Sequence, residues 1–88
     1  MFGLPEVKRG IFAGGGGLVR LPSRVPLPIA MEITLTGEPI TAQRALSLGL
    51  INEVVPRGTA VSAAVRLAER ICANAPLSVR LSKRVLRD

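Results

Sequence analysis

Glycine and proline interrupt this chain so often that only short helices and strands fit between them. The 88 residues include 9 glycines and 7 prolines. Proline breaks a helix and is excluded from central strands, and glycine marks turns and helix ends. The longest stretch free of both is 59–75. One small domain of short elements is therefore expected, and an enzyme with a large substrate cleft of its own is not.

Between these interruptions, apolar residues repeat with the spacing of helices. Thr41 is a good N-cap, and Gly37 and Gly49 are typical C-terminal stops. The run 50–55 is β-branched and predicts a short edge strand, whereas 1–12 is expected to be a loop with an extended piece. The predicted helices are a short one after the glycines at 14–17, then 28–36, 42–48, 59–73 and 76–87. The predicted fold class is mainly α with one short strand.

The two C-terminal helices carry apolar stripes that predict burial against a core. Cys72, on the first stripe, is expected to be a small core residue rather than a reactive thiol, because no base lies near it in the sequence. A core of this size cannot cover the first stripe fully, so that face is also a candidate interaction surface. The stripes comprise Val61, Ala64, Val65, Ala68, Ile71 and Cys72 in the first helix and Leu77, Leu81 and Val85 in the second.

The last helix also carries a basic stripe, formed by Arg80, Lys83, Arg84 and Arg87. Such a stripe either binds the phosphates of a nucleotide-like ligand, an anionic membrane or an acidic partner, or it is a solvated helix face. The net charge of +6 permits an anionic partner. Bases are spread along the whole chain, however, and Phe2 and Phe12 are its only aromatic residues. Nucleic acid is therefore not an expected partner.

Residue types that the chain lacks exclude several chemistries. With no histidine and one cysteine, the chain cannot build a disulfide framework, a Cys- or His-based metal site or a Ser–His or Cys–His nucleophile. No metal is expected. No apolar run reaches the ~20 residues of a membrane span, and the expected location is cytoplasmic. Residues 1–25 faintly resemble a transit peptide, but Pro5 and the glycines interrupt the amphipathic helix that such a peptide needs.

The four consecutive glycines, Gly14 to Gly17, have two interpretations. Glycines before a helix can leave N–H groups free to hold a phosphate, or they can form a tight turn into the helix. A P-loop is excluded because no Gly-Lys-Ser/Thr sequence follows, and a dinucleotide fingerprint because no preceding strand or ribose-binding acid is present. Pro22, Pro26 and Pro28 are expected to separate this helix from the next.

Glu6 is the acidic residue with the most suggestive position. It follows Pro5 in a loop framed by glycine and proline. A carboxylate held against apolar side chains is suited to proton transfer. The alternative is an exposed loop glutamate, or one paired with Lys8 or Arg9. Its apolar neighbours in the sequence are Phe2, Leu4, Val7, Ile11 and Phe12.

Several short motifs follow one another along the chain. They are Phe2-Gly3-Leu4-Pro5-Glu6-Val7, the glycines 14–17, Arg20-Leu21-Pro22, Ala30-Met31-Glu32, Leu35-Thr36-Gly37, Gly49-Leu50-Ile51-Asn52-Glu53-Val54-Val55 and Ala75-Pro76-Leu77. Each is common by itself. The ordered set extends over essentially all 88 residues, and it resembles the crotonase superfamily, most closely its enoyl-CoA hydratase/isomerase members.

The resemblance implies an acyl-CoA enzyme. In that family two backbone N–H groups form an oxyanion hole for a thioester enolate, and two glutamates handle the proton and the water. Carried over onto this sequence, Glu6 would be the second glutamate and the catalytic acid/base. Gly14 would border the acyl pocket, and Leu4, Val7 and Ile11 are expected to bind substrate with it. A coenzyme A thioester would be the substrate, and no separate cofactor is expected.

Much of the family's pattern has no counterpart here. Before Met1 these parts are the spiral β-domain, both oxyanion loops and the turn that carries the first glutamate, and beyond Asp88 a closing helical segment. Ala13 stands where the family commonly has proline. We therefore expect a partial α/β crotonase fold that lacks the N-terminal β-spiral domain. Residues 1–25 would be the end of the crotonase core, and 26–88 a C-terminal helical region.

The expected function is hydration or isomerisation of an acyl-CoA double bond by general acid/base catalysis, in an incomplete chain. Such a chain would form a homo-oligomer or pair with a missing N-terminal part. The alternative is a non-catalytic helical interaction module.

Overall fold

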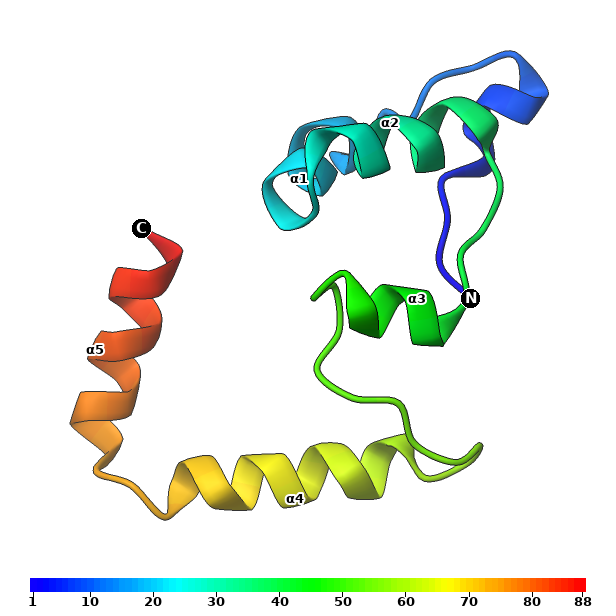
Figure 1. Cartoon of the computed structure of the whole chain (residues 1–88). Coiled ribbons are helices and arrows are strands. Elements are labelled where there is room, and N and C mark those ends of the chain that lie inside the picture. Colours follow the sequence, from blue (N-terminus) through cyan, green and yellow to red (C-terminus); the bar gives the residue numbers. More distant parts are fainter. The chain divides into compact units, whose positions relative to one another are not determined.

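Helices make up the regular structure of this chain, which the computed structural model describes from residue 1 to residue 88. The chain divides between Val54 and Val55 into two units. The first holds the 3-10 helix η1 (Pro5–Arg9), α1 (Gly17–Arg24), α2 (Leu27–Thr36) and α3 (Ala42–Ser47), and the second holds α4 (Ala60–Cys72) and α5 (Pro76–Arg87) (Figure 1). The mainly α prediction is confirmed. The predicted division into the end of the crotonase core over 1–25 and a C-terminal helical region over 26–88 stays a prediction.

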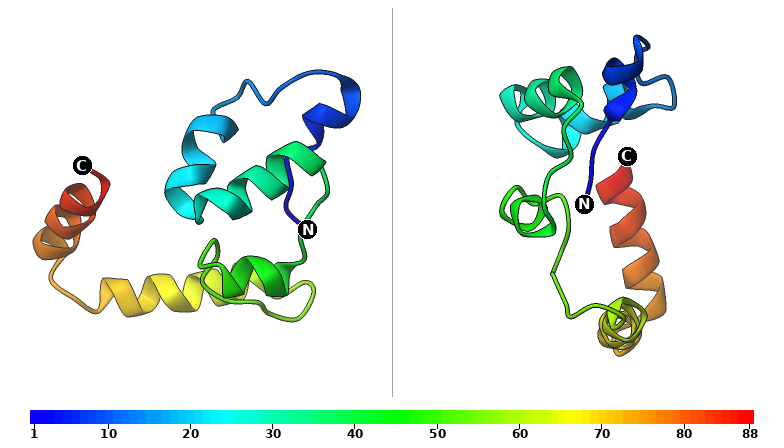
Figure 2. Two further views of the ribbon diagram at one scale, coloured as in Figure 1. Left: turned by 45° about the horizontal axis from the view of Figure 1, so that its top comes forward. Right: turned by 90° about the vertical axis from the view of Figure 1, so that its right-hand side faces the viewer.

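The core of the first unit forms around α2, which packs against η1 and α1 (Figure 2). Ile33 of α2, Ile40 and Ala45 are buried together. Ala45 is 0% exposed, so α3 lies directly against this cluster. Partly buried apolar side chains complete it, namely Leu21, Ile29, Leu48, Leu50 and Ile51.

The first residues of the chain pair with the segment after α2. The Phe2 N–H donates to the Ile40 carbonyl at 3.0 Å, and the Ile40 N–H donates to the Phe2 carbonyl at 2.7 Å. This isolated antiparallel bridge is the extended piece expected in 1–12, and η1 forms in the remainder. Both segments belong to one unit, so the bridge connects the N-terminus to the core.

The strand predicted over 50–55 is wrong. Residues 50–55 form a bend and an irregular segment, and the Leu50 N–H donates to the Ala45 carbonyl at 2.9 Å, closing α3. A strand needs a neighbouring strand to receive its hydrogen bonds, and no segment of this chain offers one beside 50–55. The prediction of one short strand therefore fails in a chain without a sheet.

Pro22 lies inside α1, and the break between α1 and α2 predicted among the three prolines falls at Val25 and Pro26. α1 continues to Arg24 and closes where the Val25 N–H donates to the Leu21 carbonyl at 3.1 Å. Pro22 lies near the C-terminal end, where a proline removes a single hydrogen bond from a helix that is about to stop. The glycines before α1 make the expected turn, with Gly16 left-handed at φ 98° as the N-cap.

The second unit has the predicted helices without the predicted burial. α4 and α5 do not pack side by side, and α4 buries only Ala63. Val61 is 78% exposed and Leu77 is 69% exposed. Cys72 is exposed as well, so its prediction as a core residue is wrong for this chain. Both stripes lack a partner element within the unit, which is why apolar periodicity did not lead to burial.

The predicted cap of α3 forms, and its removal has a measurable cost. The Arg44 N–H donates to the Thr41 hydroxyl at 3.1 Å. We expect Thr41→Ala to lower the free energy of unfolding of the first unit by ~0.5–2 kcal/mol, because an N-terminal N–H of the helix loses its acceptor. Urea unfolding followed by circular dichroism measures this. Thr41→Ser keeps the hydroxyl and is the control; an equal loss in both variants would contradict the capping role.

Candidate functional site

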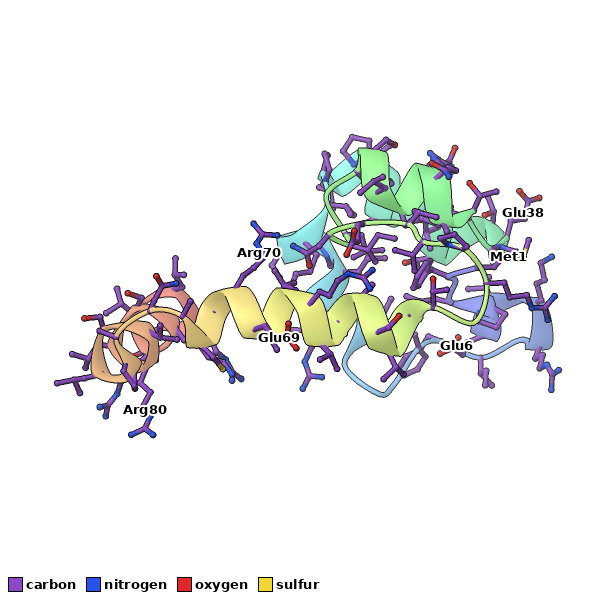
Figure 3. The ribbon with its side chains drawn as sticks, turned by 90° about the horizontal axis from the view of Figure 1, so that it is seen from below. Met1, Glu6, Glu38, Glu69, Arg70 and Arg80 are labelled. Carbon is purple, nitrogen blue, oxygen red and sulfur yellow. The ribbon has the colours of Figure 1, made fainter.

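Glu6 lies on η1, a turn that the local sequence stabilises at both ends. Pro5 occupies the start of the 3-10 helix, where its fixed φ suits the turn. Gly10 ends it in the left-handed conformation at φ 74°, and its N–H donates to the Val7 carbonyl at 3.3 Å. The Ile11 N–H donates to the Glu6 carbonyl, also at 3.3 Å. Figure 3 labels Glu6 on this segment.

The side chain of Glu6 is half-buried and unpaired. Its exposure is intermediate, and the chain's one ion pair joins Arg44 to Glu32 elsewhere in the unit. Glu6 is therefore not fully exposed, and it makes no ion pair with Lys8 or Arg9. The carboxylate therefore has no fixed charged partner that would compete with a reacting group.

An open pocket of about 480 Å³ lies beside the N-terminal segment. Its lining is apolar except for two cations, Arg20 and Arg24, which lie one turn apart on α1. Arg20 bends back toward the glycine turn, since its Cζ is 3.2 Å from where a Cβ on Gly16 would be. The other lining residues are Met1, Phe2, Gly3, Leu4, Gly17, Leu21, Ile33, Ile40 and Leu50.

Of the predicted site residues, only Leu4 lines this pocket. Both methyl groups of Leu4 lie 3.1 Å from where a Cβ on Gly17 would be, so Leu4 contacts the start of α1. Val7 is half-buried, Ile11 is 59% exposed, and Gly14 has open space where a Cβ would project. The structure does not gather Glu6, Leu4, Val7, Ile11 and Gly14 into one cavity, and their roles stay predictions.

Sequence reasoning missed the two arginines of the pocket. The sequence pattern places Arg20 only within a motif and does not single out Arg24. The four-residue spacing of Arg20 and Arg24 could have placed them on one helix face, had the helix been expected to extend past Pro22.

The basic stripe predicted on the last helix does form one surface. Arg80, Lys83, Arg84, Arg87 and Asp88 surround an open hollow of about 460 Å³ on α5, and Figure 3 labels Arg80 there. No group of three histidine, cysteine or acidic side chains is placed to hold a metal ion. None of the helices combines the length and apolarity required to span a bilayer.

Comparison with known proteins gives a consistent result. The sequence profile of the enoyl-CoA hydratase/isomerase family matches residues 1–88. An enoyl-CoA hydratase of Mycobacterium tuberculosis is 42% identical over 87 residues, which is 99% of this chain and 33% of that protein. Among solved structures, carnitinyl-CoA hydratase from Mycobacterium avium has 64% identity and a TM-score of 0.92, covering 97% of this chain and 33% of the other.

A second solved structure, an enoyl-CoA hydratase from Mycobacterium marinum, has 55% identity and a TM-score of 0.93, and the match covers 98% of this chain and 34% of the other. The chain thus spans about a third of the length of the Mycobacterium relatives named here. Similarity extends through both units, whereas about two thirds of each relative has no counterpart in these 88 residues.

Proposed function

This chain belongs to the enoyl-CoA hydratase/isomerase family, and from that premise we propose that it supplies one catalytic carboxylate to an acyl-CoA site, with Glu6 as a general acid/base. The substrate would be an unsaturated acyl thioester of coenzyme A, with no separate cofactor. The reaction would be water addition across the double bond or a shift of that bond. The chain would be the part of a crotonase fold that follows the β-spiral domain, working in the cytoplasm.

The half-buried, unpaired side chain of Glu6 supports this proposal most strongly. It lies in a chain that matches the family over its whole length. Hydrogen bonds at Gly10 and Ile11 hold the turn that carries Glu6. A general acid/base needs a positioned carboxyl group that is free to exchange a proton. Leu4, which contacts the first residue of α1, provides an apolar surface two residues before Glu6.

In the proposed hydration, the oxygen of water adds at the β-carbon while its proton passes to a carboxylate, and the electrons of the double bond move onto the thioester oxygen as an enolate. A proton delivered to the carbon next to the carbonyl then neutralises the enolate, and Glu6 would be the carboxyl group that acts at one of these two carbons. In a double-bond shift, Glu6 would remove a proton or return it at one of the carbons of the allylic system, again through an enolate. In both cases negative charge develops on the thioester oxygen before the carbon is protonated. Oxyanion-hole donors stabilise such charge by ~3–4 kcal/mol each. Those donors and the first glutamate would come from the two thirds of the fold that this chain does not span.

We therefore expect the 88-residue chain alone to show no appreciable hydration of a short 2-enoyl-CoA. Activity should appear in a chimera in which residues 1–88 replace the matching third of the Mycobacterium marinum hydratase. The loss of absorbance of the conjugated thioester measures the activity of the chain alone and of the chimera. Full activity of the chain alone would contradict the need for the rest of the fold. A folded chimera without activity would contradict the proposed function.

A second candidate function is a non-catalytic interaction module, and the exposed apolar faces of α4 and α5 favour it. On α5, Leu86 is 86% exposed and Val85 is 73% exposed, and Leu77 on the same helix and Val61 on α4 are exposed as well. Monomeric soluble proteins rarely leave such faces uncovered. Under this proposal the two helices bind a second copy of the chain or a longer homologue. Analytical ultracentrifugation tests it, and a well-folded monomer at high concentration would contradict it.

A further inference from the structure

Gly37 lies against the turn that carries Glu6. It ends α2 in the left-handed conformation at φ 67°, it is buried, and its N–H donates to the Ile33 carbonyl at 3.2 Å. A Cβ at this position would lie 2.9 Å from Cγ of Lys8 and 3.1 Å from Cγ2 of Val7. Val7 and Lys8 directly follow Glu6 in η1. The α2 terminus can approach η1 this closely only because Gly37 has no side chain.

The residues after Gly37 also contact the chain before Glu6. A Cβ at Gly3 would lie 3.0 Å from the Cα of Pro39, so these two backbones touch. Next to that contact, Phe2 and Ile40 exchange two backbone hydrogen bonds. The segment 37–40 therefore contacts the chain on both sides of Glu6, at residues 2–3 before it and at residues 7–8 after it.

We propose that Gly37–Ile40 is a brace that positions Glu6, and that Gly37 is the positioning residue within it. The proposal rests on the proposed function of Glu6 as acid/base. The branched Val7 side chain is stiff at χ1. An added methyl group at Gly37 would therefore displace the whole η1 turn rather than rotate the Val7 side chain. The Lys8 stem can rotate away more easily. Gly37 touches neither substrate nor reacting atoms, and it acts only through the turn.

Displacement of a catalytic group lowers the rate without weakening substrate binding. A misplacement of about 1 Å can cost ~10²-fold. For the few tenths of an ångström that an alanine at Gly37 requires, we expect kcat to fall about tenfold, with KM within twofold of the parent value. A purely structural role would lower stability and leave the kcat of the folded fraction unchanged.

Gly49 is a matched control. It follows α3 in the same left-handed conformation, at φ 77°, and a Cβ there would meet nothing within 4 Å. Gly37→Ala and Gly49→Ala therefore share the backbone strain of a non-glycine residue at positive φ. Only Gly37→Ala adds a contact with η1. The difference in kcat between the two variants therefore measures the effect of the contact between residue 37 and η1.

The experiment compares both variants in the chimera and, independently of activity, in the 88-residue chain by amide hydrogen exchange. Gly37→Ala should lower kcat at unchanged KM and speed exchange at Gly10 and Ile11, whose N–H groups close η1. Gly49→Ala should change neither. If Gly37→Ala does not fold, Gly3→Ala tests the same brace without positive-φ strain, and the same fall in kcat is expected.

Unchanged kcat in a folded Gly37→Ala or Gly3→Ala chimera would overturn the proposal, as would equal effects of Gly37→Ala and Gly49→Ala. Failure of the proposed function gives a different result. In that case the folded chimera is inactive or Glu6→Gln leaves its activity intact, while the exchange rates at Gly10 and Ile11 still report whether Gly37 holds the turn.

Discussion

Replacing Glu6 with glutamine in the chimera is expected to lower kcat by ~10²–10⁴-fold, the range that a positioned general acid/base contributes. Glutamine keeps the size and polarity of the side chain but cannot exchange the proton. KM should change little, because the substituted group acts in the transition state rather than in binding. Steady-state hydration of a short 2-enoyl-CoA measures both constants.

Glu53→Gln is the matched control for this loss. Glu53 is an exposed glutamate in the same unit, and it makes no ion pair. Its substitution removes the same charge without touching η1, so kcat should stay within twofold of the parent value. Equal losses in the two variants would indicate a general charge effect and contradict the role of Glu6.

Ile33→Ala is expected to abolish cooperative unfolding of the first unit. Ile33 is 4% exposed and packs with Ile40 and Ala45 at the centre of the core. Truncating a buried isoleucine costs ~2–5 kcal/mol, and the core of so small a domain rarely supplies more than about 3–5 kcal/mol. Urea titration of the 88-residue chain, followed by circular dichroism, should show a broad transition in place of a sigmoidal one.

Leu35→Ala is the comparison for this variant. Leu35 lies on the same helix and loses a side chain of the same volume, but it is 65% exposed. Its transition should stay cooperative and close to that of the parent chain. If Ile33→Ala and Leu35→Ala unfolded at the same urea concentration, the assignment of the core to Ile33 would be wrong.

The exposed apolar faces of the second unit and the partial match to longer relatives agree with one another. The stripe of α4 has the periodicity of a buried helix, and yet Val65 and Ile71 remain exposed. The Mycobacterium tuberculosis relative is about three times as long as this chain. Faces with this periodicity and this exposure favour the proposal that a partner covers them.

Local chemistry could be predicted from the sequence alone. Helix bounds depend on residues within one or two turns, so the cap at Thr41 and the glycine stop at Gly37 appeared where they were expected. Family membership was equally accessible, because ordered short motifs do not depend on how the chain packs. The half-buried position of Glu6 was only partly foreseen, from its apolar neighbours in the sequence.

Tertiary structure alone decided what depends on distant partners. The run 50–55 is not a strand, because no neighbouring strand receives its hydrogen bonds. Cys72 is exposed because nothing in its unit covers α4. Gly37 was expected only as a helix stop, and its contact with Val7 and Lys8 became visible when the fold joined segments thirty residues apart in the sequence. Periodicity and capping are local properties, whereas burial, strand pairing and the position of the Glu6 side chain depend on contacts between segments that are distant in the sequence.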